Sequence, residues 1–151
     1  MVAPRIKLLL VLAIVAVLAV PVWILASPLF LATQGNEETP TGFSSVIATG
    51  AFVDGEPGHT SSGEARLLHD GSGYVLRFEN FSVTNGPGLY VYLAKGPRVA
   101  DGDPELGPLK ASQGFSNYAI PEGVDPRTYG YVVIWCKPFL VQFGYAALAF
   151  A

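Results

Sequence analysis

The stretch Tyr131–Cys136, YVVIWC, is apolar at every position and rich in β-branched and aromatic side chains. Such residues favour β-strands, and a short apolar run without alternation is typical of a strand covered on both faces. Because successive side chains of a strand point to opposite faces, we expect Cys136 to lie with Val132 and Ile134, and Trp135 on the other face. The sequence therefore predicts a central strand with a sheltered thiol at its end.

Short apolar or alternating runs recur throughout the chain after Gly42. Clusters of Gly, Pro, Asn and Asp, which are typical of turns, separate these runs, and no window keeps the apolar spacing of a helix over several turns. The further predicted strands are Ser45–Val53, Glu64–His69, Gly73–Phe81, Leu89–Leu93, Phe115–Ile120, Phe139–Phe143 and Tyr145–Phe150. This pattern predicts a single all-β domain that is antiparallel and sandwich-like or barrel-like.

Residues 8–32 form a stretch of 25 residues without an ionisable side chain. At about 1.5 Å per residue, a helix of this length exceeds the ~30 Å core of a bilayer. The stretch therefore predicts one transmembrane helix that anchors the chain in the lipid bilayer. The alternative is a cleaved signal peptide, with the small residues Ala26 and Ser27 near its end, although the apolar part of a signal peptide is usually shorter.

The charges that flank this stretch predict its orientation. Arg5 and Lys7 precede it and Glu37 and Glu38 follow it, so the positive-inside rule keeps the N-terminus in the cytoplasm. The predicted organisation is a cytoplasmic N-terminus at 1–7, a transmembrane anchor at 8–32, a solvated linker at 33–41 and an extracytoplasmic β-domain at 42–151. The protein is thus expected at the cell membrane as a single-pass protein with its C-terminal domain outside.

Charge and cysteine content exclude several classes of function. The net charge is −3 and the acidic and basic residues after Gly42 are interspersed, so no basic face is available for a nucleic-acid partner. The chain has one cysteine, which cannot form an internal disulfide. A single cysteine also excludes Cys-rich zinc or iron–sulfur sites built within one molecule.

Cys136, Lys137 and Pro138 are the most distinctive candidate site. Cys136 has two interpretations. It is a redox or nucleophilic thiol at the point where Pro138 ends the strand ladder and where Lys137 favours the thiolate. Alternatively, it is a small buried hydrophobic residue. As the next residue along the strand, Lys137 points away from the thiol unless the backbone twists. Residue types alone leave both interpretations open.

Two other groups have weaker patterns. His59 and His69, with Cys136, are residue types that bind transition metals, but their spacing supports no preformed site. Asp101, Asp103 and Glu105 alternate as calcium ligands can, but the remaining ligands of a calcium loop are missing. We therefore predict no metal site, and the sequence does not firmly imply a cofactor.

Tyr90 and Tyr92 alternate with Leu89, Val91 and Leu93. One face of this strand is therefore expected to be core and the other aromatic. The tyrosine face is either covered by a loop or is a surface that binds sugar rings or a protein.

Several segments, taken in order, resemble one family. They are Gly63-x-Ala65, Val75-Leu76-Arg77-Phe78-Glu79-Asn80-Phe81, Asn85-Gly86-Pro87-Gly88-Leu89-Tyr90-Val91-Tyr92-Leu93, Leu106-Gly107-x-Leu109-Lys110, Gly114-x-x-x-Tyr118-x-Ile120-Pro121, and Val133-Ile134-Trp135-Cys136-x-x-Phe139-x-Val141-x-Phe143-Gly144-x-Ala146-x-Leu148. The chain from about Phe43 to Leu148 resembles the electron-transfer DM-thirteen domain, an extracytoplasmic β-domain often found beside DOMON domains. The resemblance implies a β-sandwich-like domain whose cysteine, here Cys136, takes part in redox chemistry. An acidic residue is common in that family after the Gly-Pro pair, where this chain has Gly88.

The sequence thus leads to three hypotheses. The first is a membrane-anchored domain with a redox or electron-transfer role through Cys136, with Trp135 and Lys137 beside it and a redox or surface protein as partner. It would be a redox accessory domain and not a self-contained enzyme. The second is a non-catalytic binding module for a polysaccharide or protein, and the third is an electron carrier with a cofactor held by His59, His69 or Cys136.

Overall fold

The computed structural model describes residues 4–30 and 32–151. Residues 1–3 and 31 lie outside the described residues, as do the side chains of residues 4, 5, 10 and 22–30. The predicted cytoplasmic segment 1–7 and the predicted anchor 8–32 fall in part on these residues, which include the side chains of Arg5, Ala26 and Ser27. The chain divides into two compact units, Met1–Leu31 and Ala32–Ala151.

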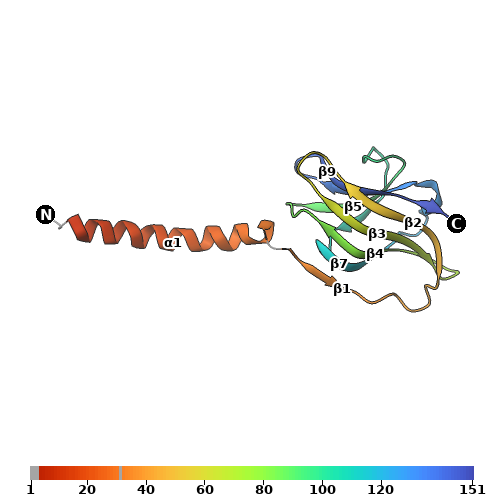
Figure 1. Cartoon of the computed structure of the whole chain (residues 1–151), viewed down its shortest axis with the longest axis horizontal. Coiled ribbons are helices and arrows are strands. Elements are labelled where there is room, and N and C mark those ends of the chain that lie inside the picture. The colour runs from red at the N-terminus through yellow and green to blue at the C-terminus, as the bar shows by residue number, and fades with distance from the viewer. Residues whose placement is uncertain (1–3, 31) are drawn as a thin grey trace. The chain divides into compact units, whose positions relative to one another are not determined.

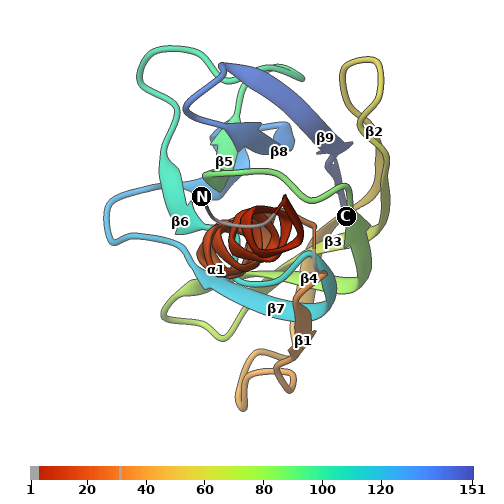
Figure 2. The same cartoon turned by 90° about the vertical axis from the view of Figure 1, so that its left-hand side faces the viewer.

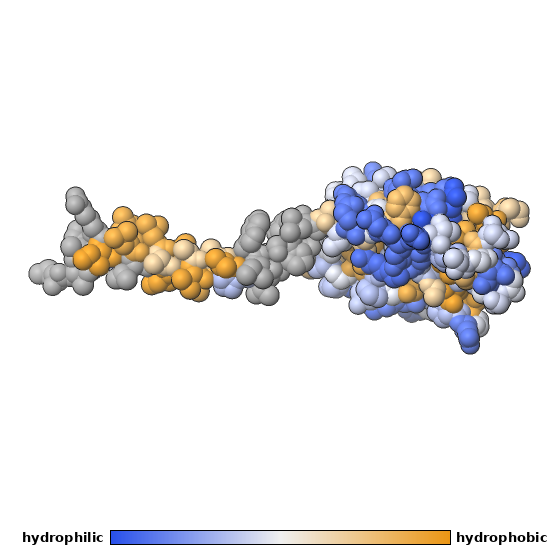
Figure 3. Space-filling model, turned by 90° about the horizontal axis from the view of Figure 1, so that it is seen from below, coloured by the Kyte–Doolittle hydropathy of each residue, from blue (hydrophilic) through white to orange (hydrophobic). Residues whose placement is uncertain are grey.

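The N-terminal unit consists of helix α1, Pro4–Phe30. Leu and Ala, which are strong helix formers, make up much of its sequence. The large apolar side chains described in α1 are exposed, among them Leu9, Ile14 and Val17, and appear as hydrophobic surface in Figure 3. Within the described residues, no helix combines the length and the hydropathy that a membrane crossing requires.

The C-terminal unit is built from β-strands, which confirms the prediction of an all-β domain (Figure 1). The strands are β1 (Gln34–Asn36), β2 (Ser45–Asp54), β3 (Ser61–His69), β4 (Tyr74–Val83), β5 (Leu89–Ala94), β6 (Glu105–Pro108), β7 (Gln113–Ala119), β8 (Tyr131–Cys136), β9 (Val141–Ala147) and β10 (Ala149–Phe150). A short 3-10 helix, η1 (Pro126–Thr128), precedes β8. The strands form one sheet in the order β1-β7-β4-β3-β2-β9-β8-β5-β6, with β10 paired to β2.

The sheet curls because β2 pairs with two different neighbours. Residues Ser45–Ala51 of β2 pair with β3, whereas Phe52–Asp54 pair with β9. A Cβ at Gly50 would overlap the carbonyl of Ala147, so glycine permits the close approach of β2 and β9. In Figure 2, β6, β5, β8 and β9 consequently lie on one side and β7, β4 and β3 on the other. The result is a curled half-barrel.

The core fills the concave side of this curl. Phe52, Phe78 and Phe81 come from β2 and β4 and pack edge-to-face or tilted, with ring centroids 4.8 to 4.9 Å apart. Aromatic pairs at such separations add about 0.5–1.5 kcal/mol beyond the burial of their surface. Ile134 and Cys136 of β8 belong to the same cluster. The thiol is therefore part of the main core.

Three predictions about strands need correction. The predicted linker 33–41 contains β1, which pairs in parallel with β7, so the sheet is mixed and not purely antiparallel. Strand β6, Glu105–Pro108, was not predicted because half of its residues are Gly or Pro, which disfavour strands. Phe139 and Leu140 form a turn before β9 and do not begin a strand, since Leu140 has a φ of 55°.

Candidate redox site around Cys136

Cys136 is the last residue of β8, the strand hydrogen-bonded between β5 and β9. Its cross-strand neighbours are Leu89 on β5 and Val141 on β9. The side chain is 0% exposed, and Val132 and Ile134 are buried with it in the core. The predicted central strand, its face assignment and the sheltered thiol are confirmed.

Among the residues that the structure describes, the thiol has one polar contact. Sγ of Cys136 donates a hydrogen bond to the carbonyl oxygen of Pro87 at 3.0 Å, and the backbone N–H of Lys137 donates to the carbonyl of Gly88 at 3.1 Å. Gly88 has a φ of 61°, and a Cβ there would lie 2.9 Å from Cδ of Pro138. The turn before β5 is thus bonded to the end of β8 at two successive carbonyls, and this holds the sulfur in one orientation.

An apolar groove of about 440 Å³ adjoins the cysteine. His59 and Phe143 form one part of its wall, with their rings stacked at a centroid distance of 3.8 Å. Pro87 and Val141 line the groove as well, and these are the hydrogen-bond partner and a cross-strand neighbour of Cys136. The sulfur therefore does not line the groove itself but lies behind Pro87, which contacts both.

The predicted partners of Cys136 lie on the other face of β8. Trp135 is half-buried, pairs with Tyr90 and Gln142, and has the guanidinium of Arg98 6.0 Å from its ring centroid. Its placement away from the core agrees with the predicted alternation. Trp135 therefore does not cover the sulfur from within the core.

Lys137 also points away from the thiol. Its Nζ lies 2.8 Å from Oε2 of Glu105 and 4.3 Å from the ring centroid of Tyr90. The hydrogen bond to Glu105 raises the pKa of Lys137, and the hydrogen bonds from Lys137 and Tyr92 hold the pKa of Glu105 below its usual range. The ammonium thus pairs with a carboxylate and not with the thiol, as the alternation along the strand predicted.

The two tyrosines of β5 differ in burial, and Tyr92 is the covered one. Tyr92 is only 8% exposed, and its hydroxyl donates a hydrogen bond to Oε2 of Glu105 on the neighbouring strand β6 at 2.5 Å. Burial, followed by this hydrogen bond, raises the pKa of Tyr92 to about 12. Tyr90 lies beneath the ammonium of Lys137. Tyr92 is therefore covered by the neighbouring strand β6 and not by a loop, whereas Tyr90 remains partly exposed.

The remaining candidates do not assemble around Cys136. His69 packs on Tyr74 and its Nδ1 accepts the N–H of Gly71, whereas His59 lines the groove. Asp103 accepts the N–H of Ala100 within its own turn. Within the part of the chain that the structure describes, no group of three or more His, Cys, Asp or Glu side chains could hold a metal ion.

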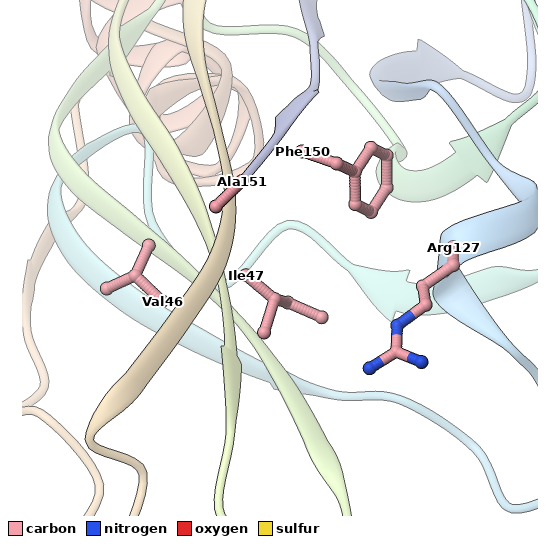
Figure 4. Close-up of a pocket in the computed structure, with 5 residues that line it drawn as sticks. All are labelled: Val46, Ile47, Arg127, Phe150 and Ala151. Atoms are coloured by element: carbon pink, nitrogen blue, oxygen red, sulfur yellow. The ribbon is translucent and has the colours of Figure 1, made fainter.

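A second hollow, of about 380 Å³, lies between the start of β2, η1 and the C-terminal segment. Figure 4 shows Ile47, Arg127 and the ring of Phe150 around it, with Val46 on the other side of the β2 ribbon. None of the predicted site residues lines this hollow.

Sequence reasoning missed two features of the site. The carbonyl of Pro87 gives no signal in a sequence, although its turn Asn85–Gly88 was recognisable. Glu105 was considered only as a calcium ligand, whereas it joins Tyr92 to Lys137. Recognising this link required the pairing of β5 with both β6 and β8.

Comparison with known protein families identifies the domain. The family model described as electron transfer DM13 matches residues 51–148, which is well over half of the chain. Comparisons with curated proteins and with solved structures give no significant match. The matched region runs from β2 to the end of β9 and includes Cys136, Tyr92 and Glu105. On this match, the chain belongs to the electron transfer DM13 family.

Proposed function

We propose that this domain has a redox role in which Cys136 is the group that is oxidised and reduced. Membership of an electron-transfer family supports a redox-related role for the domain. The observation that carries the assignment to Cys136 is the position of its sulfur, bonded to Pro87 directly behind the groove. No other cysteine is present in the chain.

The chemistry of a lone thiol requires a second molecule. The Cys136 thiol loses its proton to water, and the thiolate attacks a disulfide of a partner protein. A new S–S bond then joins Cys136 to one partner sulfur, and the other partner sulfur leaves as a thiolate. A dithiol of a second protein then acts as the reductant. Its first thiolate attacks the Cys136 sulfur and releases the partner's remaining thiolate, and its second thiolate attacks the first, which forms the donor's disulfide and frees Cys136. Two electrons thus pass from the donor dithiol to the partner disulfide through Cys136.

Access to the sulfur requires a local opening. The turn after β8 is the natural place, because Phe139 is 67% and Leu140 is 69% exposed, and neither is held by core packing. Phe139 and Val141 line the groove, so displacement of this turn widens it toward Cys136. Short exposed turns with few buried contacts open at the lowest free energy.

Thiol alkylation tests this proposal. The rate of reaction of Cys136 with iodoacetamide is measured in the folded domain by intact mass. We expect slow but complete reaction without denaturant, and a several-fold faster reaction in Phe139→Ala because the wall of the groove is removed. Phe150→Ala is the matched control, since Phe150 is an exposed aromatic residue that does not line the groove.

Two results would overturn the proposal. One is that Cys136 reacts only after denaturation, both in the wild type and in Phe139→Ala. The other is equal acceleration by Phe139→Ala and Phe150→Ala, which would mean that general loosening, and not the groove, controls access.

We further propose that residues 8–32 anchor the chain in the membrane with the domain outside the cytoplasm. The length of this uncharged stretch and the flanking Arg5, Lys7, Glu37 and Glu38 support the proposal. Intact-mass measurement on the membrane fraction should find the full chain. A chain that begins near Ala26 or Ala32 would instead identify a cleaved signal peptide.

The second candidate function is a non-catalytic module that binds a protein. The exposed apolar pair Phe139 and Leu140 beside the groove favours it, whereas Tyr92 is buried and cannot stack on a sugar. This function predicts that Cys136→Ser leaves partner binding intact while Phe139→Ala removes it. The redox role predicts that Cys136→Ser abolishes the mixed disulfide.

A further inference from the structure

The outer face of the strands next to Cys136 carries a connected group of ionisable side chains. Tyr92 comes from β5, Glu105 from β6, and Lys137 directly follows β8. The Tyr92 hydroxyl and the Lys137 ammonium both bind the same carboxylate oxygen, Oε2 of Glu105, at 2.5 and 2.8 Å. The phenol is thus fixed against a base.

Lys137 keeps that base ionised. Its hydrogen bond is the largest contribution that lowers the pKa of Glu105, and the hydrogen bond from Tyr92 acts in the same direction. At neutral pH, Glu105 is therefore a carboxylate with a bound phenol and a bound ammonium. Such charge-assisted hydrogen bonds are short and strong, in keeping with the O···O distance of 2.5 Å.

We propose that Tyr92 is a one-electron donor whose phenolic proton passes to Glu105 as the electron leaves. The electron goes to an external one-electron acceptor of high reduction potential, whose oxidation state falls by one. The O–H bond of Tyr92 breaks and an O–H bond forms on Oε2 of Glu105, which leaves a neutral phenoxyl radical and a neutral carboxylic acid. When an electron returns to Tyr92, the proton returns with it.

The other aromatic side chains with nearby cations are less suited to this reaction. A positive charge over a ring makes removal of an electron harder, and Tyr90 has Lys137 at 4.3 Å while Trp135 has Arg98 at 6.0 Å from the ring centroid. Tyr118 is buried, but its hydroxyl accepts the N–H of Lys110. Lys137 lies near the Tyr92 hydroxyl as well, but Tyr92 differs because its hydroxyl donates directly to the carboxylate that pairs with this ammonium.

Burial of Tyr92 favours a stable and reversible radical. With 8% exposure, the ring is shielded from solutes and from coupling with a second tyrosine. Glu105 itself is exposed, so the transferred proton exchanges with water more slowly than it passes between Tyr92 and Glu105. The inference rests on the redox role of the proposed function, but it does not require Cys136 to react.

Flash oxidation of the full chain in a Cys136→Ser background tests the inference independently of the thiol. The oxidant is photoexcited ruthenium tris-bipyridine with a sacrificial cobalt acceptor, and the radical is followed by electron paramagnetic resonance. We expect a neutral tyrosyl signal that Tyr92→Phe largely removes. Tyr145→Phe is the matched control, because Tyr145 is half-buried and packs on Tyr131 with a centroid separation of 6.2 Å.

Glu105→Gln tests the proton transfer. The amide oxygen still accepts a hydrogen bond from Tyr92 but takes up no proton, so we expect the radical to form at least about tenfold more slowly, in line with the usual effect of a positioned base. Glu105→Asp restores part of the rate. In the unaltered protein, replacing water with heavy water must also slow radical formation, and this readout needs no variant to fold.

Several outcomes would overturn the inference. They are a signal that Tyr92→Phe leaves unchanged, an equal loss in Tyr145→Phe, a rate that Glu105→Gln does not alter, or the absence of an isotope effect. Failure of the thiol proposal is a different observation, namely an unreactive Cys136 in a protein that still forms the Tyr92 radical.

Discussion

The two faces of β8 and β5 differ in how they are buried. On the inner face, Val132, Ile134 and Cys136 are sealed by apolar side chains, and the thiol donates a hydrogen bond to the carbonyl of Pro87. On the outer face, Tyr92 is nearly as buried, but its hydroxyl belongs to a network that reaches the exposed Glu105 and Lys137. Burial on the inner face limits access by other molecules, whereas burial on the outer face leaves a path for protons. The same strands therefore carry a sealed thiol on one face and a phenol within a hydrogen-bonded network on the other.

Truncating the inner face should have the largest effect. Ile134→Ala removes a fully buried side chain of the core and leaves a cavity. We expect it to lower the free energy of unfolding by about 2–5 kcal/mol. Denaturant unfolding measures the loss, and Lys137→Met on the exposed outer side serves as the control with a much smaller change. Equal losses would mean that the two faces do not differ in packing.

A substitution at Gly88 tests how tightly the turn before β5 packs against the end of β8, where the carbonyls of Pro87 and Gly88 accept hydrogen bonds. Gly88→Ala adds a β-carbon at a residue whose φ is 61° and places it 2.9 Å from Cδ of Pro138. We therefore expect the free energy of unfolding to fall by about 1–2 kcal/mol. Thermal unfolding checks the value. In Gly88→Ala combined with Pro138→Ala, the overlapping ring atoms are absent and part of the stability should return. If the double variant recovers nothing, the strain comes from the backbone alone.

The outer network should make a smaller, pH-dependent contribution. Because hydrogen bonds hold the pKa of Glu105 below its ordinary value of 4.5, the folded protein binds this proton more weakly than the unfolded chain does. The stabilisation is present above pH 4.5 and is lost as the pH falls through the lowered pKa. We expect the difference in melting temperature between the wild type and Glu105→Gln to be small at neutral pH and to vanish in acid. A difference that grows in acid would contradict this assignment.

The smallest effect concerns the titration of Tyr92 alone. The phenol should deprotonate near pH 12 in an ultraviolet titration, and Tyr92→Phe should remove this step. Glu105→Gln should lower the pKa of Tyr92 because the carboxylate raises it, and Lys137→Met should raise the pKa because the ammonium lowers it. The titratable groups around the hydroxyl are Glu105 and Lys137, with Tyr90 beneath the ammonium. Shifts of the same sign in the two variants would contradict the network.

The prediction from sequence was most accurate where periodicity is strong. The strand Tyr131–Cys136 was predicted with its observed bounds, and its alternation placed the thiol correctly in the core. Prediction failed at β1, a three-residue polar strand within the expected linker, and at β6, where Gly and Pro obscure the pattern. These short strands depend on the edges of the sheet that they pair with, and not on their own residues.

For the candidate site, alternation predicted that Lys137 points away from Cys136, but it did not identify Glu105 as the partner of Lys137. The sequence places Lys137 beside Cys136, yet alternation along β8 turns it toward Glu105, more than thirty positions away in the chain. Tyr92 and Glu105 likewise meet only because β5 pairs with β6 on one side and β8 on the other. Predicting such contacts requires the order of the strands in the sheet, and a local sequence pattern does not contain this order.

Local chemistry was thus enough to establish the β-rich fold and the sheltered lone thiol, because these follow from side-chain alternation and turn-forming residues, whereas the family resemblance came from an ordered set of matching segments. The curl of the sheet, the groove beside Cys136 and the Tyr92–Glu105–Lys137 network followed only from folding in three dimensions. The reason is physical: alternation determines which face a residue occupies, whereas the pairing of distant strands determines what it meets there.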